Sequence, residues 1–251
     1  MSPENVPASE TARDHFIKRA AKYDQSSRWV EDTALIEKIR EQADAGPEAC
    51  VLDLAIGTGK IAQAFHGRVQ QVVGVDICQE MVAQARPHAD KIVLTSAEKL
   101  PFENDTFDVC VCRQGLQFME LSAVLAQIHR VLKPGGRVVL AHLTAYGEED
   151  KDETFLIQKL RNPSRKNFFM PDDFSRLLRG QGFKAIQSSE YLTRESIDQW
   201  TDHGAIGEDA RLKIRAVYTN ASEAFKARHD VQWKEDDIWD TMKMVLVKAV
   251  K

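Results

Sequence analysis

The stretch Val51-Leu52-Asp53-Leu54-Ala55-Ile56-Gly57-Thr58-Gly59 joins an apolar run to two closely spaced glycines. An apolar run that stops at glycines predicts a buried strand that turns sharply into a helix. Gly57 and Gly59 lack the side chains that would keep the backbone away from a ligand, and a helix over residues 60–65 would direct its N-terminal amides into the same space. The segment therefore predicts a nucleoside-binding turn, although its spacing also fits a dinucleotide fingerprint.

The segments that follow predict further strands and a partner for a ribose. A second apolar strand over residues 71–75 ends at Asp76, and an acidic side chain at this separation can accept hydrogen bonds from ribose hydroxyls. Further strands are expected over residues 91–94, 109–112 and 137–143, with helical stretches between them. Strands that alternate with helices predict an α/β fold with a doubly wound, mostly parallel sheet.

The order of these segments resembles that of class I S-adenosylmethionine-dependent methyltransferases, in particular the small-molecule branch that includes the ubiquinone and menaquinone C-methylases. The resemblance covers roughly residues 20–183. It is carried by the glycine turn, Asp76, Ser96-Ala97-Glu98, Phe107-Asp108 and Leu132-Lys133-Pro134-Gly135-Gly136. It implies a Rossmann-like sheet that ends in an antiparallel strand, methyl transfer as the activity, and S-adenosyl-L-methionine as the cofactor.

The resemblance also implies a set of cofactor contacts. It assigns the loop from Ala55 to Gly59 to the methionine moiety and Asp76 to the ribose, and it places Ile77 and Met81 beside the adenine. The expected cofactor-binding residues are Tyr23, Asp53, Ala55, Gly57, Gly59, Asp76, Ile77, Met81, Ser96, Ala97, Glu98 and Arg113.

Two of these positions depart from the family pattern, and a third has a second explanation. Ser96 stands where the family commonly has Asp to bond the adenine amino group, and its hydroxyl can accept the same bond without a charge. Ala55 replaces the first glycine of the family loop and adds only a methyl group. Tyr23 matches a residue that covers the cofactor carboxylate, but it could equally pack in the core as part of an amphipathic helix.

The candidates for chemistry follow the fourth and fifth strands, because ligands of open α/β sheets bind beyond the carboxyl ends of the strands. A sulfonium methyl group is already electrophilic, so the protein mainly has to align the acceptor and exclude water. His142 is the preferred general base if the acceptor must lose a proton, although strand histidines more commonly bond a backbone carbonyl. Arg113 could bind an acidic acceptor or pair with a carboxylate, while Gln114 and Gln117 could orient the acceptor or lie at the surface.

Composition argues against several other functions. A net charge of −4 with interspersed signs lacks the basic face that nucleic-acid binding requires. No apolar run is long enough to span a bilayer and no signal peptide is recognisable, which predicts a cytoplasmic protein without a membrane partner. The four cysteines lack metal-ligand spacing, so no metal site is expected. The expected partner is a small-molecule acceptor, and a homodimer is left open.

The chain divides into four predicted segments. They are an N-terminal helical cover over residues 1–46, the methyltransferase core over 47–193, a helical insertion over 194–240 that forms a cap or a dimer contact, and the last core strand over 241–251. The cover should hold a helix capped by Ser9 that runs to about Tyr23 and a second helix over residues 30–43. Residues 147–170 are expected to be a polar connector.

Two other functions share part of this pattern. A dinucleotide-dependent oxidoreductase would use the same glycine turn, but it leaves the stretches at residues 97–108 and 132–136 unexplained and would need a second catalytic domain. A non-catalytic or regulatory S-adenosylmethionine-binding module would keep the fold and Asp76 without turnover. Methyl transfer to O, N or C of a small organic acceptor accounts for the whole set of motifs.

Overall fold

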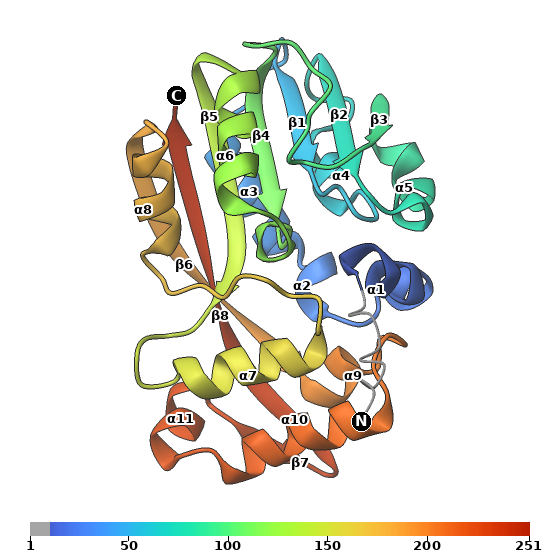
Figure 1. Ribbon diagram of the computed structural model, residues 1–251, viewed down its shortest axis with the longest axis vertical. Helices are drawn as coiled ribbons and strands as arrows, with labels where there is room; N and C mark the ends of the chain where they lie inside the picture. The colour runs from blue at the N-terminus through green and yellow to red at the C-terminus, as the bar shows by residue number, and fades with distance from the viewer. Residues whose placement is uncertain (1–10) are drawn as a thin grey trace, which may run out of the picture.

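The computed structural model describes residues 11–251, in which an eight-stranded sheet carries helices on both faces (Figure 1). The strand order is β3-β2-β1-β4-β5-β8-β6, and β7 pairs with β8. This is the mostly parallel, doubly wound arrangement that the sequence predicts. Ser9, the expected cap of the first helix, lies outside the described residues.

The first five strands in the chain form the parallel part of the sheet. They are β1 (Cys50–Leu54), β2 (Gln71–Asp76), β3 (Lys91–Leu94), β4 (Phe107–Arg113) and β5 (Leu132–Thr144). Leu54 of β1 is in register with Val75 of β2, and Asp53 is in register with Val111 of β4. The carboxyl ends of these three strands therefore meet at one edge of the sheet, and the residues that follow them come together.

The remaining strands are antiparallel to their neighbours. They are β6 (Lys184–Ser196), β7 (Gln232–Lys234) and β8 (Asp237–Val250), with β8 between β5 and β6. The core was expected to end at residue 193 and its last strand to begin at residue 241, but the pairing of β6 with β8 continues to Ser196 and Trp239. These strands thus extend into the region predicted as an insertion.

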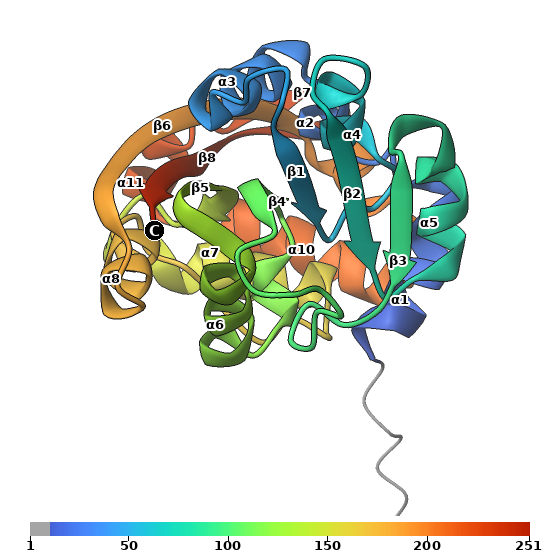
Figure 2. The ribbon, with the colours of Figure 1, turned by 90° about the horizontal axis from the view of Figure 1, so that it is seen from above.

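Helices cover both faces of the sheet. They are α1 (Ala12–Arg19), α2 (Arg28–Glu31), α3 (Thr33–Ala43), α4 (Lys60–Phe65), α5 (Gln79–Ala85), α6 (Leu121–Val131), α7 (Lys151–Arg161), α8 (Asp173–Gly180), α9 (Ile197–Thr201), α10 (Glu208–Asn220) and α11 (Glu223–Arg228). The helices α3 and α4 pack on one face, and α6 and α8 pack on the other (Figure 2). The helical segment between β6 and β7 lies at one end of the sheet, where α10 packs against α7.

Three helices differ from the sequence-based expectation. The first begins at Ala12 and is capped by Thr11, whose side chain forms a capping box with Asp14, and it gives way to a 3₁₀ turn before Tyr23. The second predicted helix is broken at Asp32, whose carboxylate caps α3 by accepting from the backbone of Leu35 at 3.1 Å. The expected polar connector contains α7, whose buried face includes Gln158 and is therefore not visible as an apolar stripe.

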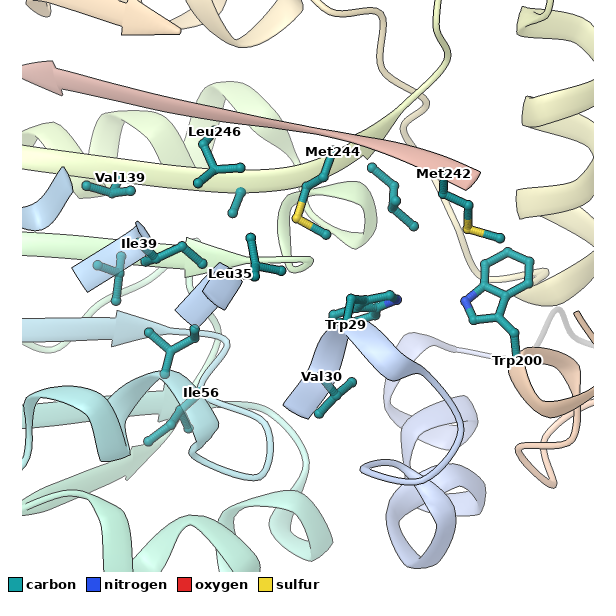
Figure 3. Packing of buried hydrophobic residues seen from close by; sticks show 14 of the residues in the cluster. Trp29, Val30, Leu35, Ile39, Ile56, Val139, Trp200, Met242, Met244 and Leu246 are labelled. Carbon is teal, nitrogen blue, oxygen red and sulfur yellow. The ribbon is translucent and has the colours of Figure 1, made fainter. Parts of the chain in front are cut away.

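One hydrophobic cluster joins the sheet to the helices at its end. Trp29 of α2 and Trp200 of α9 lie on the same side of β8 as Met242 and Met244 (Figure 3). Both tryptophans are at most 4% exposed. The helical segment therefore shares a core with the sheet.

Candidate functional site

A cavity of about 600 Å³ opens at the carboxyl ends of β1, β2 and β4. Its sheet side includes Ala55, Gly57 and Asp76, and its opposite side is covered by residues of α1 and by residues 163–166 after α7. Ten of the twelve residues expected to bind the cofactor line it, namely all except Asp53 and Gly59. A volume of this size suits a small-molecule site.

The turn after β1 brings the backbone close to the cavity. Ala55 has φ +59 and Gly57 has φ +56, which is the left-handed region that favours glycine. Gly59 has φ +86 and caps the N-terminus of α4, and a Cβ there would lie 3.1 Å from the Cα of Ala85. Gly59 thus allows the turn to pack against α5, whereas Ala55 and Gly57 face the ligand space.

Asp76 holds this turn to the end of β2. Its carboxylate accepts from the backbone N–H of Gly57 at 2.9 Å and from that of Cys78 at 3.0 Å. Burial raises the pKa of Asp76, and the backbone hydrogen bonds oppose that rise. The carboxylate also lines the cavity, so it retains lone pairs that can accept from ligand hydroxyls.

Asp53 and Arg113 have structural surroundings that the sequence does not reveal. Asp53 lies inside β1, is 2% exposed and does not line the cavity. Burial raises the pKa of Asp53 to about 7, although the nearby guanidinium of Arg113 opposes this. Arg113 lines the cavity, but its Nη1 donates to the carbonyls of Trp29 and Val30 at 3.1 Å, which fixes α2 to the end of β4.

His142 does not reach the cavity. It is fully buried in β5 and stacks on Phe174 with ring centroids 5.0 Å apart. Burial lowers the pKa of His142 to about 3, so the imidazole is neutral over the ordinary pH range. A neutral imidazole would suit a general base, but this one has no access to an acceptor in the cavity.

His142 instead stands at the end of a chain of hydrogen bonds that leads to the cavity. Its Nδ1 lies 3.3 Å from Oε1 of Gln117, and Nε2 of Gln117 donates to Oε1 of Gln114 at 3.1 Å. Gln114 lines the cavity, and its buried Nε2 has no hydrogen-bond partner among residues 11–251. The chain thereby fixes the amide of Gln114, which leaves a donor for a ligand.

The expected adenine end is partly satisfied by its own loop. The hydroxyl of Ser96 donates to Oε2 of Glu98 at 2.9 Å and accepts from the backbone N–H of Glu98 at 3.2 Å. Ile77 is 38% exposed, while Met81 is buried. Ser96 therefore keeps one lone pair for a ligand amino group.

Several lining residues were not among the predicted site residues. Phe16 and Arg13 come from α1, and Arg165 comes from the loop after α7, far from the motif residues along the chain. Trp200 is the one described residue of 197–236 that lines a cavity adjoining the main one, and none of that segment lines the main cavity itself. The cover over the site is thus made by α1 and residues 163–166.

Residues 11–251 show neither a metal-ligand cluster nor a membrane-spanning helix. They contain no group of three or more His, Cys, Asp or Glu side chains placed to hold a metal ion. Nor does any helix there have the length and apolarity to cross a membrane.

Comparisons with known proteins agree on the kind of domain. A family model described as a methyltransferase domain matches residues 52–140. The uncharacterized methyltransferase YcgJ of Bacillus subtilis is 26% identical over 247 residues, covering 94% of this chain and 97% of the relative. The ubiquinone/menaquinone biosynthesis C-methyltransferase UbiE of Burkholderia vietnamiensis is 40% identical over 117 residues, covering 43% of this chain and 48% of the relative. The crystal structure of the Bacillus YcgJ protein shares the fold, with a TM-score of 0.79 and 24% identity over 86% of this chain and 97% of that one.

Proposed function

We propose that this chain, a class I S-adenosylmethionine-dependent methyltransferase, transfers the methyl group to an oxygen, nitrogen or carbon atom of a small organic acceptor. The observation that carries the proposal is the cavity of about 600 Å³, which is covered by α1 and by residues 163–166. A covered cavity suits a small molecule, whereas a macromolecular acceptor would call for an open groove.

The residues around the cavity fit the cofactor. When bound, S-adenosylmethionine supplies an electrophilic methyl group. Gly57 lets the backbone approach the ligand, and Asp76 offers carboxylate lone pairs to ribose hydroxyls. Tyr23 and Phe16 cover the opposite side and exclude water from the reacting atoms.

Gln114 is the proposed positioning residue for the acceptor. Its amide is fixed by Gln117, and its buried Nε2 has no partner within residues 11–251. Because a preformed donor needs no reorganisation, it can hold the acceptor in line with the donor methyl group. This route needs no general base unless the acceptor must lose a proton, and it uses His142 only to orient Gln117.

The proposal includes the setting in which the protein works. We propose that the enzyme works in the cytoplasm, and its net charge of −4 with interspersed signs supports an activity that does not involve nucleic acid. The segment over residues 194–240 was expected to form a cap or a dimer contact. We propose that it either supports the cavity through Trp200, without covering it, or forms a homodimer contact. Light scattering on the purified protein separates these two roles, because only the second requires a dimer.

Two measurements test the proposed function. Calorimetric titration should show binding of S-adenosylmethionine and of S-adenosylhomocysteine, and undetectable binding at millimolar ligand would refute it. A cell extract supplied with methyl-labelled S-adenosylmethionine should then yield label in the small-molecule fraction. Label that appears only in protein or nucleic acid would overturn the small-molecule acceptor.

A further inference from the structure

Three buried arginines lie next to the main cavity. Arg19, Arg161 and Arg165 are 3%, 7% and 7% exposed, although arginine is rarely buried in proteins unless it is paired. All three line a second cavity of about 30 Å³. This second cavity shares lining residues with the main one, among them Gln114 and Tyr23, so the two spaces adjoin at the proposed acceptor position.

These guanidinium groups lack acidic partners. Within residues 11–251, none of them has a carboxylate oxygen within ion-pair distance, and Nε and Nη2 of Arg19 and Nη2 of Arg165 have no hydrogen-bond partner. Arg161 donates to the carbonyl of Trp200 at 2.9 Å and to the hydroxyl of Ser27 at 3.1 Å. The acceptors that bond to Arg161 are therefore neutral.

Aromatic rings supply most of the other contacts. The guanidinium of Arg161 lies 4.1 Å from the ring centroid of Trp200, and that of Arg19 lies 5.0 Å from the ring centroid of Tyr23. The stabilisation of a buried cation by such contacts falls well short of the desolvation cost of the charge. They hold the arginines in place without neutralising them.

A buried carboxylate that acts on Arg161 is already engaged by backbone donors. Glu195 is 1% exposed and accepts from the backbone N–H groups of Arg28 and Trp29 at 2.9 and 3.0 Å. It favours the charge of Arg161, whereas Arg19 and Arg165 oppose that charge. Glu195 therefore offsets part of the charge of Arg161, and it is not among the groups that shift the pKa of Arg19 or Arg165.

Burial has the expected effect on these groups. It lowers the pKa of Arg19 to about 10 and the pKa of Arg165 to about 9, so both remain charged at neutral pH. Burial, with Arg19 nearby, also lowers the pKa of Arg161. A buried cluster of like charges is unfavourable unless a ligand of opposite charge completes it.

We propose that the methyl acceptor carries an oxyanion, a carboxylate or a phosphate, which Arg19, Arg161 and Arg165 bind while its reactive end lies beside Gln114. The guanidinium fork matches both groups because each offers paired oxygens. This inference rests on the proposed methyl transfer and narrows its acceptor to an anionic small molecule. Such a group would accept hydrogen bonds from the guanidinium nitrogens of Arg19 and Arg165 that have no partner among residues 11–251.

The test uses the full chain saturated with S-adenosylhomocysteine, with inorganic phosphate and acetate as separate probes. We expect one of the two to bind saturably by calorimetry and to raise the melting temperature. Which probe binds distinguishes a phosphate-bearing acceptor from a carboxylate-bearing one. Arg19→Gln and Arg165→Gln should each weaken that binding by about tenfold or more, which corresponds to the loss of one charged hydrogen bond.

Matched controls separate ligand binding from folding. Arg68 is exposed, so Arg68→Gln should leave probe affinity unchanged. Without probe, Arg19→Gln should melt no lower than the unmutated protein, because it removes an uncompensated buried charge. A lower melting temperature together with unchanged probe affinity would mean that Arg19 is a structural residue, and it would overturn the inference.

Two other results would also overturn it. The first is failure of both probes to bind while S-adenosylhomocysteine still binds, which leaves the proposed methyl transfer intact. The second is an equal loss of probe and S-adenosylhomocysteine affinity in Arg19→Gln, since that guanidinium would then serve the carboxylate of the cofactor. Failure of S-adenosylhomocysteine to bind the unmutated protein would instead refute the proposed function itself.

Discussion

His229 joins the helical segment to the sheet through two buried carboxylates. Its Nδ1 lies 2.9 Å from Oδ1 of Asp240 on β8, and its Nε2 lies 3.1 Å from Oδ2 of Asp150 before α7. All three side chains are at most 4% exposed. Burial alone would lower the pKa of His229, but the hydrogen bonds to Asp150 and Asp240 outweigh it and raise the pKa to about 9.

The raised pKa converts into a pH-dependent stability. A rise from 6.5 to about 9 corresponds to about 3 kcal/mol, at about 1.4 kcal/mol per pKa unit, and the low exposure leaves little solvent screening. Because the folded-state pKa lies above the unfolded value, this contribution is fully present below pH 6.5 and is lost as the pH rises through about 9.

The perturbation is His229→Gln, studied by urea unfolding followed by tryptophan fluorescence at pH 6 and at pH 9. At pH 6 the free energy of unfolding should fall by at least about 3 kcal/mol, because the variant also leaves two buried carboxylates without their cation. The difference in the free energy of unfolding between the unmutated protein and His229→Gln should be smaller at pH 9 than at pH 6. His66→Gln is the matched control, since His66 is 41% exposed beside Asp90 and should change stability by less than about 1 kcal/mol.

One result would refute this reasoning directly. If the free energy lost in His229→Gln were the same at pH 6 and pH 9, the imidazole would be neutral in the native state. The hydrogen bonds to Asp150 and Asp240 would then involve a protonated carboxyl group, and the segment would be held by neutral contacts.

Four further predictions concern the site and its cover. Asp76→Ala should weaken S-adenosylhomocysteine binding by about 1 to 3 kcal/mol in calorimetry, because it removes the ribose partner and the hydrogen bond to Gly57. Unchanged affinity would contradict the assignment of Asp76 to the ribose. Gly59→Ala should destabilise the fold by about 1 to 3 kcal/mol more than Gly67→Ala. Both glycines have positive φ, but of the two only Gly59 has atoms within 4 Å of a new Cβ. Equal losses of stability in thermal unfolding would show that packing against Ala85 is unimportant. His142→Gln should leave the shape of the pH profile of kcat between pH 5 and 8 unchanged, because the imidazole is neutral over this range and does not line the cavity. If the variant lost a limb of the profile that the unmutated enzyme shows, His142 would be the general base after all. In hydrogen exchange, the amides of residues 193–196 should be better protected than those of α1, because they belong to a sheet ladder. The reverse order would mean that the paired strands open more readily than α1 unfolds.

The parallel sheet was predictable because its signals are local. Apolar runs that end at Gly57 or Asp76 mark both a strand and its carboxyl end, and the register then brings those ends together. The mostly parallel fold is confirmed. The cofactor contacts stay predictions, although the structure gathers most of those residues around one cavity.

The features that were missed depend on contacts between distant segments. Alternation along β1 cannot show that Asp53 faces the interior with Arg113 nearby rather than the ligand. The buried face of α7 carries Gln158 and Arg161, so its pattern resembles that of a solvated connector. Arg19 and Arg161 are far apart in the chain, and only the tertiary fold makes them neighbours. Burial of polar side chains was the information that periodicity could not supply.

The continuous pairing of β6 with β8 determines which side of the cavity can move without breaking the sheet. Both strands run from the parallel sheet into the helical end, where Thr193 pairs with Met242 and Ser196 pairs with Trp239 (Figure 1). An outward movement of that end would break the continuous backbone pairing of β6 with β8. Within residues 11–251, α1 has no backbone pairing with the sheet. Of these two sides of the cavity, α1 is therefore the one whose displacement leaves the sheet intact.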